Sequence, residues 1–257
     1  MASTTEHTGS EALGVGSIVG ESFSILFKNF ITVILLALVP TLLSSVIAGM
    51  MVGADVALGA ADPDFSTSSG VTTWVLTILL QVVFYALTTA LLVQLAYDAK
   101  LGRRLQVGRY FAPALQAAIP VAVLTTVAGI LTGFATLALI IPGLWVYAVF
   151  SMVAPAVVIE KAGFGGLGRS AALTKGYRWP IFGALLLIGI CAGIGGFLAS
   201  FAAGLLEGVG SWAMTAGFSV VAAFGAGLSG ISVALIYARL REIKEGVSVD
   251  QIASVFD

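Results

Sequence analysis

The stretch Ile140–Pro180, IIPGLWVYAVFSMVAPAVVIEKAGFGGLGRSAALTKGYRWP, decides the fold. Its first half continues a longer apolar run, because no charged residue occurs between Arg109 and Glu160. Residues 119–159 alone make 41 uncharged positions, whereas one helical crossing of a bilayer takes about 20 residues. The run therefore predicts two membrane crossings that fold back on each other.

The turn of this hairpin is expected at Pro142-Gly143, between crossings at residues 119–139 and 144–159. Proline cannot continue the hydrogen-bond ladder of a helix, and glycine tolerates a left-handed backbone. The second half of the stretch is glycine-rich and basic. We expect a short helix there, residues 166–175, lying in the headgroup region and stopped by Gly176.

The composition is that of a membrane protein. Of the 257 residues, 59% are hydrophobic and 10% are charged, whereas soluble domains carry about 25% charged residues. The net charge of -1 argues against nucleic acid as a partner. The single cysteine, Cys191, excludes a disulfide within the chain and is expected to be an inert buried thiol.

Six apolar segments without Asp, Glu, Lys, Arg or His are predicted to cross the membrane. They are residues 30–52, 73–97, 119–139, 144–159, 181–205 and 212–237. The predicted fold class is all-α: a polytopic membrane protein with six transmembrane helices as three hairpins, with interfacial amphipathic helices. We expect a disordered cytoplasmic tail over residues 1–14, the membrane domain over 15–246 and a cytoplasmic C-terminal tail over 247–257.

The basic residues predict the orientation. With a cytoplasmic N-terminus, all 12 Lys and Arg fall on the cytoplasmic side, and the outer loops carry only the acids Asp55, Asp62, Asp64 and Glu207. The positive-inside rule gives this partition for an even number of crossings. Both termini are therefore expected in the cytoplasm.

Residues 15–30 precede the first crossing and show helical periodicity. Ile18, Ser22 and Leu26 share one face, whereas Glu21 lies opposite. This pattern predicts an amphipathic helix on the membrane surface. A plain N-terminal extension of the first crossing is the alternative.

A weak internal repeat accompanies the three hairpins. Each hairpin leaves the membrane at a Lys-x-Gly sequence, namely Lys100-Leu-Gly102, Lys161-Ala-Gly163 and Lys244-Glu-Gly246. Three copies of a surface segment followed by a hairpin would explain the pattern. Chance is the rival explanation, since lysine is common where helices leave a membrane.

Several motifs connect the chain with a known group of proteins. They are Ile141-Pro142-Gly143, the Pro155…Glu160 exit, Gly168-Arg169-Ser170…Leu173-Thr174-Lys175-Gly176…Trp179 and the closing Tyr237…Leu240-Arg241…Lys244-Glu245-Gly246. On these motifs the chain resembles, from about Val15 onward, the bacterial YciC-like membrane proteins and the membrane domain of some glycerophosphoryl diester phosphodiesterases. The resemblance implies a six-helix bundle in a bacterial inner (plasma) membrane and implies little about activity.

The resemblance does not carry a hydrolase activity over. The phosphodiesterase that accompanies this domain elsewhere is a separate soluble barrel that needs histidines and metal-binding carboxylates, and His7 is the only histidine here. We therefore expect a non-enzymatic protein, without metal or cofactor, in a structural, regulatory or envelope-associated role. The alternatives are a transporter or channel for a neutral or amphipathic small molecule and, third, a membrane enzyme acting on lipid phosphates.

Four residues of the basic stretch form a candidate lipid or partner surface: Arg169, Lys175, Arg178 and Trp179. Tryptophan prefers the headgroup level, and each nearby base adds about 1 kcal/mol of attraction to anionic lipid. The expected partners are membrane lipids, including anionic ones, and a membrane or cytoplasmic protein. Ordinary topological anchoring is the alternative.

Small residues predict close packing of the last two crossings. Gly189, Gly193 and Gly196 mark the fifth and Gly230 the sixth, and small residues let two backbones approach in lipid. We expect these helices to pack on each other within one bundle, with a homodimer interface as the alternative.

Gln81 and Gln94 are the strongest polar side chains of the second crossing. A spacing of 13 residues turns them to different faces of the helix. One of them could line a permeation path, but interhelical hydrogen bonding is the expected role.

Overall fold

The computed structural model describes residues 12–204 and 211–246. Every regular element in these ranges is helical, which confirms the predicted all-α class. The elements are α1 (Val15–Lys28), α2 (Phe30–Val52), α3 (Ala54–Ala57), α4 (Ser68–Lys100), α5 (Val107–Ala138), α6 (Ile140–Phe150), α7 (Val153–Ile159), the short 3-10 helix η1 (Gly163–Gly165), α8 (Gly166–Thr174), α9 (Arg178–Gly204) and α10 (Ser211–Glu245). The predicted outer loop at 206–210, the C-terminal tail and most of the N-terminal tail lie outside the described residues.

Six helical segments are long and apolar enough to cross a membrane. They are Phe30–Val52, Ser68–Lys100, Val107–Ala138, Ile140–Ile159, Arg178–Leu198 and Trp212–Glu245. Large apolar side chains also point outward, with Leu137 84% and Phe197 71% exposed, an arrangement that lipid rather than water accommodates. The chain is a multi-pass membrane protein, as predicted.

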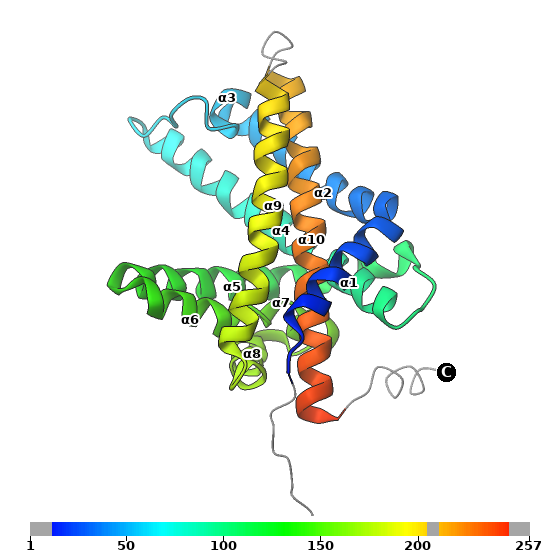
Figure 1. Ribbon diagram of the computed structural model, residues 1–257. Coiled ribbons are helices and arrows are strands. Elements are labelled where there is room, and N and C mark those ends of the chain that lie inside the picture. The colour runs from blue at the N-terminus through cyan, green and yellow to red at the C-terminus, as the bar shows by residue number, and fades with distance from the viewer. Residues whose placement is uncertain (1–11, 205–210, 247–257) are drawn as a thin grey trace, which may run out of the picture.

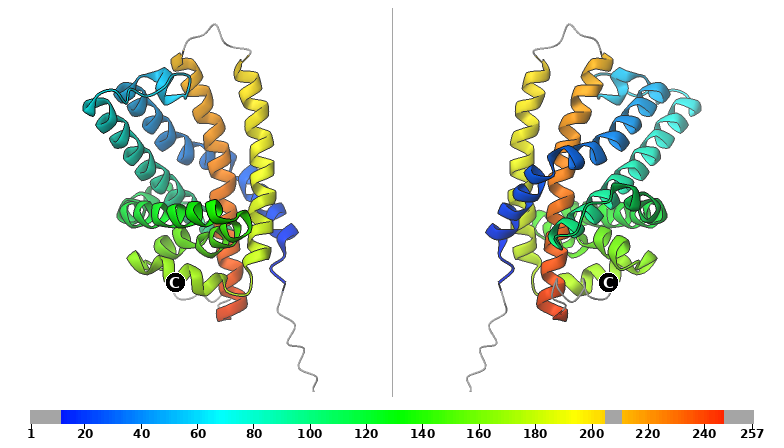
Figure 2. Two further views of the ribbon diagram at one scale, coloured as in Figure 1. Left: turned by 90° about the vertical axis from the view of Figure 1, so that its left-hand side faces the viewer. Right: turned by 90° about the vertical axis from the view of Figure 1, so that its right-hand side faces the viewer.

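The hairpins have different directions. Helices α9 and α10 run side by side, whereas α5 and α6 run across them (Figure 1). The two side views agree, and they place α8 and the end of α10 opposite α3 (Figure 2). The central hairpin is therefore strongly inclined to the last one, which is not the arrangement of a regular up-and-down bundle.

Helix α10 is the centre of the packing. It contacts α9, α2, α4 and α1, and its side chains Leu228, Ile231 and Tyr237 are fully buried. At Gly230 the helix approaches α4 so closely that an added Cβ would lie 2.8 Å from the Cβ of Leu92. Gly230 is thus a packing residue as predicted, but its partner is α4.

The predicted role of Gly189 and Gly193 in packing α9 on α10 is wrong. A Cβ at either position would meet no atom within 4 Å. The two helices do contact each other, and they meet near Gly196, where a Cβ would lie 3.9 Å from Val221. Four-residue spacing shows that two glycines share a face, but it does not show which neighbour that face meets.

The turn of the central hairpin lies three residues earlier than predicted. Leu139 is extended, with φ -161° and ψ 143°, and α6 begins at Ile140. Pro142 therefore falls in the first turn of α6. Backbone N–H groups in the first turn have no acceptor within the helix, so proline is tolerated there. Gly143 is needed for close approach, because a Cβ there would lie 2.7 Å from the Cα of Thr136.

The predicted amphipathic helix exists as α1 and is separate from α2, since Asn29 interrupts the two. Its buried residues include Ile18, Ser22 and Leu26, the predicted apolar face. That face packs on α10 and α9. The Oγ atoms of Ser22 and Ser232 lie 3.0 Å apart and form a hydrogen bond.

The Lys-x-Gly repeat has a local structural basis. Gly102, Gly163 and Gly246 adopt positive φ angles of 66°, 51° and 63°, and glycine is the residue that enters this region without strain. The wider repeat is incomplete, because the segment before the central hairpin continues into α5 without a separate surface helix.

Candidate functional site

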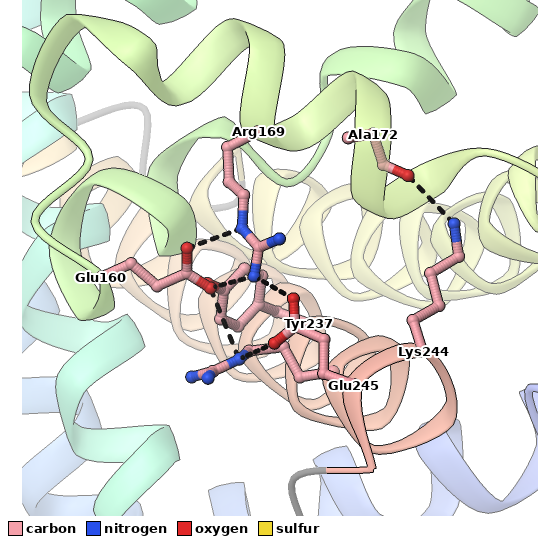
Figure 3. Close-up of polar contacts among 7 residues, drawn as sticks. Glu160, Arg169, Ala172, Tyr237, Lys244 and Glu245 are labelled. Carbon is pink, nitrogen blue, oxygen red and sulfur yellow. Dashed lines mark hydrogen bonds and ion pairs between the residues drawn. The ribbon is translucent and has the colours of Figure 1, made fainter.

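Five side chains form a charged cluster where α7, α8 and α10 meet, hereafter the ion-pair network (Figure 3). Its members are Glu160, Arg169, Tyr237, Arg241 and Glu245. Arg169 donates two parallel hydrogen bonds to Glu160, each 2.6 Å long, from Nε and Nη2. Its Nη2 also donates to Glu245. Planar guanidinium groups suit such bidentate contacts with carboxylates.

Local structure places each member of the network. Glu160 follows the last residue of α7, and Arg169 lies in the second turn of α8. Tyr237, Arg241 and Glu245 are spaced by four residues, so they project from one face of α10. Tyr237 donates its hydroxyl to Glu160, and the Nε of Arg241 lies 2.9 Å from Glu245 Oε2 and 3.4 Å from Glu160 Oε1.

The network sets the charge state of its members. Burial raises the pKa of the Glu160 carboxyl, but the hydrogen bonds from Arg169 and Tyr237 and the charges of Arg169 and Arg241 outweigh it and hold the pKa below its usual value. The hydrogen bond to Glu160 raises the pKa of the Arg169 guanidinium. Both groups are therefore ionised at neutral pH.

Lys244 attaches the end of α8 to α10. Its Nζ donates to the carbonyl oxygens of Ala172, at 3.0 Å, and Lys175, at 2.6 Å. A cation at a helix C-terminus satisfies carbonyl groups that lack intrahelical partners and interacts favourably with the helix dipole.

Helix α8 also packs against the break between α6, which ends at Phe150, and α7, which begins at Val153. This break divides the predicted crossing at 144–159. Pro155 cannot donate to the carbonyl of Ser151, so the ladder is interrupted there. Ser170 bridges the gap: its Oγ donates to the carbonyl of Val149, at 2.7 Å, and accepts from the N–H of Met152, at 3.2 Å. The buried face of α8 thus satisfies backbone groups inside the protein.

The four residues of the predicted lipid or partner surface do not share one environment. Arg169 belongs to the ion-pair network, and the Arg178 guanidinium lies 4.1 Å from the ring centroid of Trp145. Lys175 is exposed, and Trp179 is 55% exposed. The structure therefore leaves Lys175, Arg178 and Trp179 as the candidate outer surface and pairs Arg169 with Glu160 and Glu245 instead.

The two glutamines also differ. Gln94 donates from Nε2 to the carbonyl of Tyr110 in α5, at 3.1 Å, which confirms the predicted interhelical hydrogen bond. Gln81 is exposed on the outer side of α4. Neither residue lines the cavity between α4 and α6 that contains Tyr85 and Tyr147.

That cavity, of about 310 Å³, lies between α4, α5, α6, α7, α9 and α10. Six hydroxyl-bearing residues line it: Tyr85, Thr89, Thr125, Thr132, Tyr147 and Ser151. Leu185 and Val233 are among its apolar residues. We call it the hydroxyl cavity.

The sequence analysis missed both features. Two signals for the network were present in the sequence. One is the four-residue spacing of Tyr237, Arg241 and Glu245, and the other is Glu160, the acid that ends the apolar run. The hydroxyl cavity had weaker signals, because its residues come from six helices between α4 and α10.

Among the residues that the structure describes, no group of three His, Cys, Asp or Glu side chains could hold a metal ion. Comparison with known proteins gives no match to a family model, a curated protein or a solved structure. The resemblance to YciC-like proteins and to the phosphodiesterase membrane domain thus rests on the sequence motifs alone.

Proposed function

We propose that this chain is a non-enzymatic integral membrane protein with a structural, regulatory or envelope-associated role in a bacterial plasma membrane, with both termini in the cytoplasm. The observation that supports this role is the ion-pair network, in which Glu160 and Glu245 are paired with arginines. These charges join helix ends instead of converging on a cavity. They stabilise the cytoplasmic end of the bundle on which a partner would dock.

The docking surface in this proposal consists of Lys175, Arg178 and Trp179. The Nε of Arg178 is buried and has no hydrogen-bond partner within the described ranges, although such atoms are usually paired. An anionic group of a lipid or of a protein partner would pair with the positive charge of this guanidinium.

A transporter or channel for a neutral or amphipathic molecule is the second candidate function. The hydroxyl cavity favours it, because polar groups inside apolar spans are typical of substrate paths. Uptake of such a molecule into liposomes that contain the purified protein would support this function over the first.

The orientation gives a direct prediction. Reporter fusions at Thr67 are expected to report the outer side, and fusions at Arg103 and Gly166 the cytoplasm, because basic segments remain inside. Activity of paired alkaline phosphatase and fluorescent-protein fusions measures this. An outer location of the Gly166 fusion would contradict the proposed topology, because that segment connects the central and last hairpins.

The docking role is tested by photo-crosslinking in native membranes from a photoreactive amino acid at Ala172. We expect a protein adduct that Lys175→Gln combined with Arg178→Gln abolishes. The matched control, Arg104→Gln combined with Lys161→Gln, removes two exposed bases elsewhere and should retain the adduct. Labelling of lipid alone in all three proteins would overturn the partner-docking role.

A further inference from the structure

We infer that the hydroxyl cavity is a binding site for a neutral amphiphile whose headgroup carries free hydroxyls, of the monoacylglycerol class. The site is independent of the docking role proposed above, since no residue is shared between them. The argument rests on which hydrogen-bonding groups the cavity presents, on its lack of charge and on where it opens.

The cavity wall offers mainly hydrogen-bond acceptors. Thr125 donates its hydroxyl hydrogen to the carbonyl of Val121, at 2.7 Å, and Thr132 donates to Ala128, at 2.8 Å. Thr89 and Ser151 form the same kind of bond to their own helices. Each hydroxyl therefore has its one hydrogen occupied, and the two lone pairs of its oxygen can accept hydrogen bonds. A ligand that fits this wall must supply donors.

Tyr85 and Tyr147 complete the polar lining. Neither phenol hydroxyl is hydrogen-bonded to another group within residues 12–204 and 211–246. A tyrosine hydroxyl both donates and accepts. The two hydroxyls of a monoacylglycerol can each donate to a threonine or serine oxygen and accept from a phenol.

The ligand must be uncharged. The lining contains no Asp, Glu, Lys, Arg or His, so an ion would lose its hydration without gaining a counter-charge. A water occupies about 30 Å³ of liquid, so a cavity of about 310 Å³ has the volume of roughly ten waters. That volume holds a glycerol-sized headgroup and the first part of a chain.

The position of the mouth indicates an amphiphile. Tyr85 is 61% and Tyr147 46% exposed, whereas Leu185 at the inner wall is 9% exposed. Both tyrosines lie within apolar spans, so the cavity opens toward the acyl chains of the bilayer. A molecule that enters there carries an apolar chain, which remains in the lipid while the headgroup binds.

The test uses purified protein in phosphatidylcholine vesicles with a photoactivatable, alkyne-tagged monoacylglycerol. We expect labelling that unlabelled monoolein displaces. Thr125→Val should reduce the labelling about threefold to tenfold, the effect of one lost hydrogen bond. Thr126→Val is the matched control, because Thr126 forms the same bond to its own helix, at 2.7 Å, but does not line the cavity.

Four outcomes would overturn the inference. They are labelling that monoolein does not displace, equal labelling by a fatty-acid probe of the same chain length, equal loss in Thr125→Val and Thr126→Val, and displacement by glycerol, which would assign the cavity to a soluble polyol. Tyr147→Phe, which keeps the ring, provides a second variant, and circular dichroism checks that each variant is folded. None of these outcomes alters the cross-linking result expected at Ala172, so the two proposals fail separately.

Discussion

Gly230→Leu is expected to lower the free energy of unfolding by about 3 kcal/mol or more, because it inserts a side chain into a closed contact. The Cβ alone would lie 2.8 Å from the Cβ and 3.3 Å from the Cδ1 of Leu92. Leu92 is itself fully buried, so it has little room to move. Thermal unfolding in a mild detergent, followed by circular dichroism, measures the loss.

Two glycines serve as controls for this substitution. Gly225 lies in the same helix and Gly193 in α9, and a Cβ at either would meet no atom within 4 Å. Gly225→Leu and Gly193→Leu should leave the midpoint temperature unchanged or raise it slightly, since leucine has the better helix propensity. Equal losses in all three variants would show that contact with Leu92 is not the cause.

Glu160→Ala is expected to lower the free energy of unfolding by about 2 kcal/mol. It removes the acceptor of two hydrogen bonds from Arg169 and leaves this guanidinium with Glu245 as its acidic partner. Hydrogen bonds to charged groups contribute about 1.5–3 kcal/mol. The side chains of Glu160 and Arg169 are 21% and 29% exposed. Screening by solvent therefore reduces the combined contribution of the two hydrogen bonds.

The control for Glu160→Ala is Glu242→Ala. Glu242 forms an ion pair with Arg239 within one turn of α10, at 2.7 Å, and its side chain is 41% exposed. Such surface pairs contribute about 0–1 kcal/mol, so this variant should unfold close to wild type. Similar unfolding of the two variants would contradict a stabilising role of the network.

The stabilisation by Glu160 has a defined pH dependence. The pKa of Glu160 is lower in the folded protein than in the unfolded chain, so its stabilisation is complete above the unfolded value of about 4.3. It is lost as the pH falls through the folded pKa. The difference in unfolding temperature between wild type and Glu160→Gln should therefore shrink as the pH is lowered below about 4.3. A difference that stayed constant there would assign the effect to packing.

The number of apolar helices could be predicted because membrane crossings are local properties of the sequence. Helix α8 was predicted over 166–175 and observed over Gly166–Thr174, since Gly176 follows it. The turn at Leu139 was missed because proline is compatible with the first turn of a helix as well as with a break. Here tertiary contact between Gly143 and Thr136 decides between the two.

The site was predicted less well, because its geometry depends on which faces of distant helices meet. Arg169 was predicted at a membrane surface from its position beside other bases. Its actual partners, Glu160 and Glu245, lie 9 and 76 residues away. The sequence shows that a basic residue lies near the end of a membrane-spanning helix. Only the packing of the helices shows whether an acidic side chain lies within hydrogen-bond distance of it.

The contact of α1 with α10 has a consequence for synthesis in the cell. Ser22 and Ser232 are 210 residues apart, and a ribosome adds about 5–20 residues per second. Synthesis of α10 is therefore completed about 10–40 s after synthesis of α1, and the apolar face of α1 has no partner helix during this time. During that interval the nascent chain needs a temporary cover for this face, from lipid or from an insertion factor, and assembly ends only when the last helix enters the membrane.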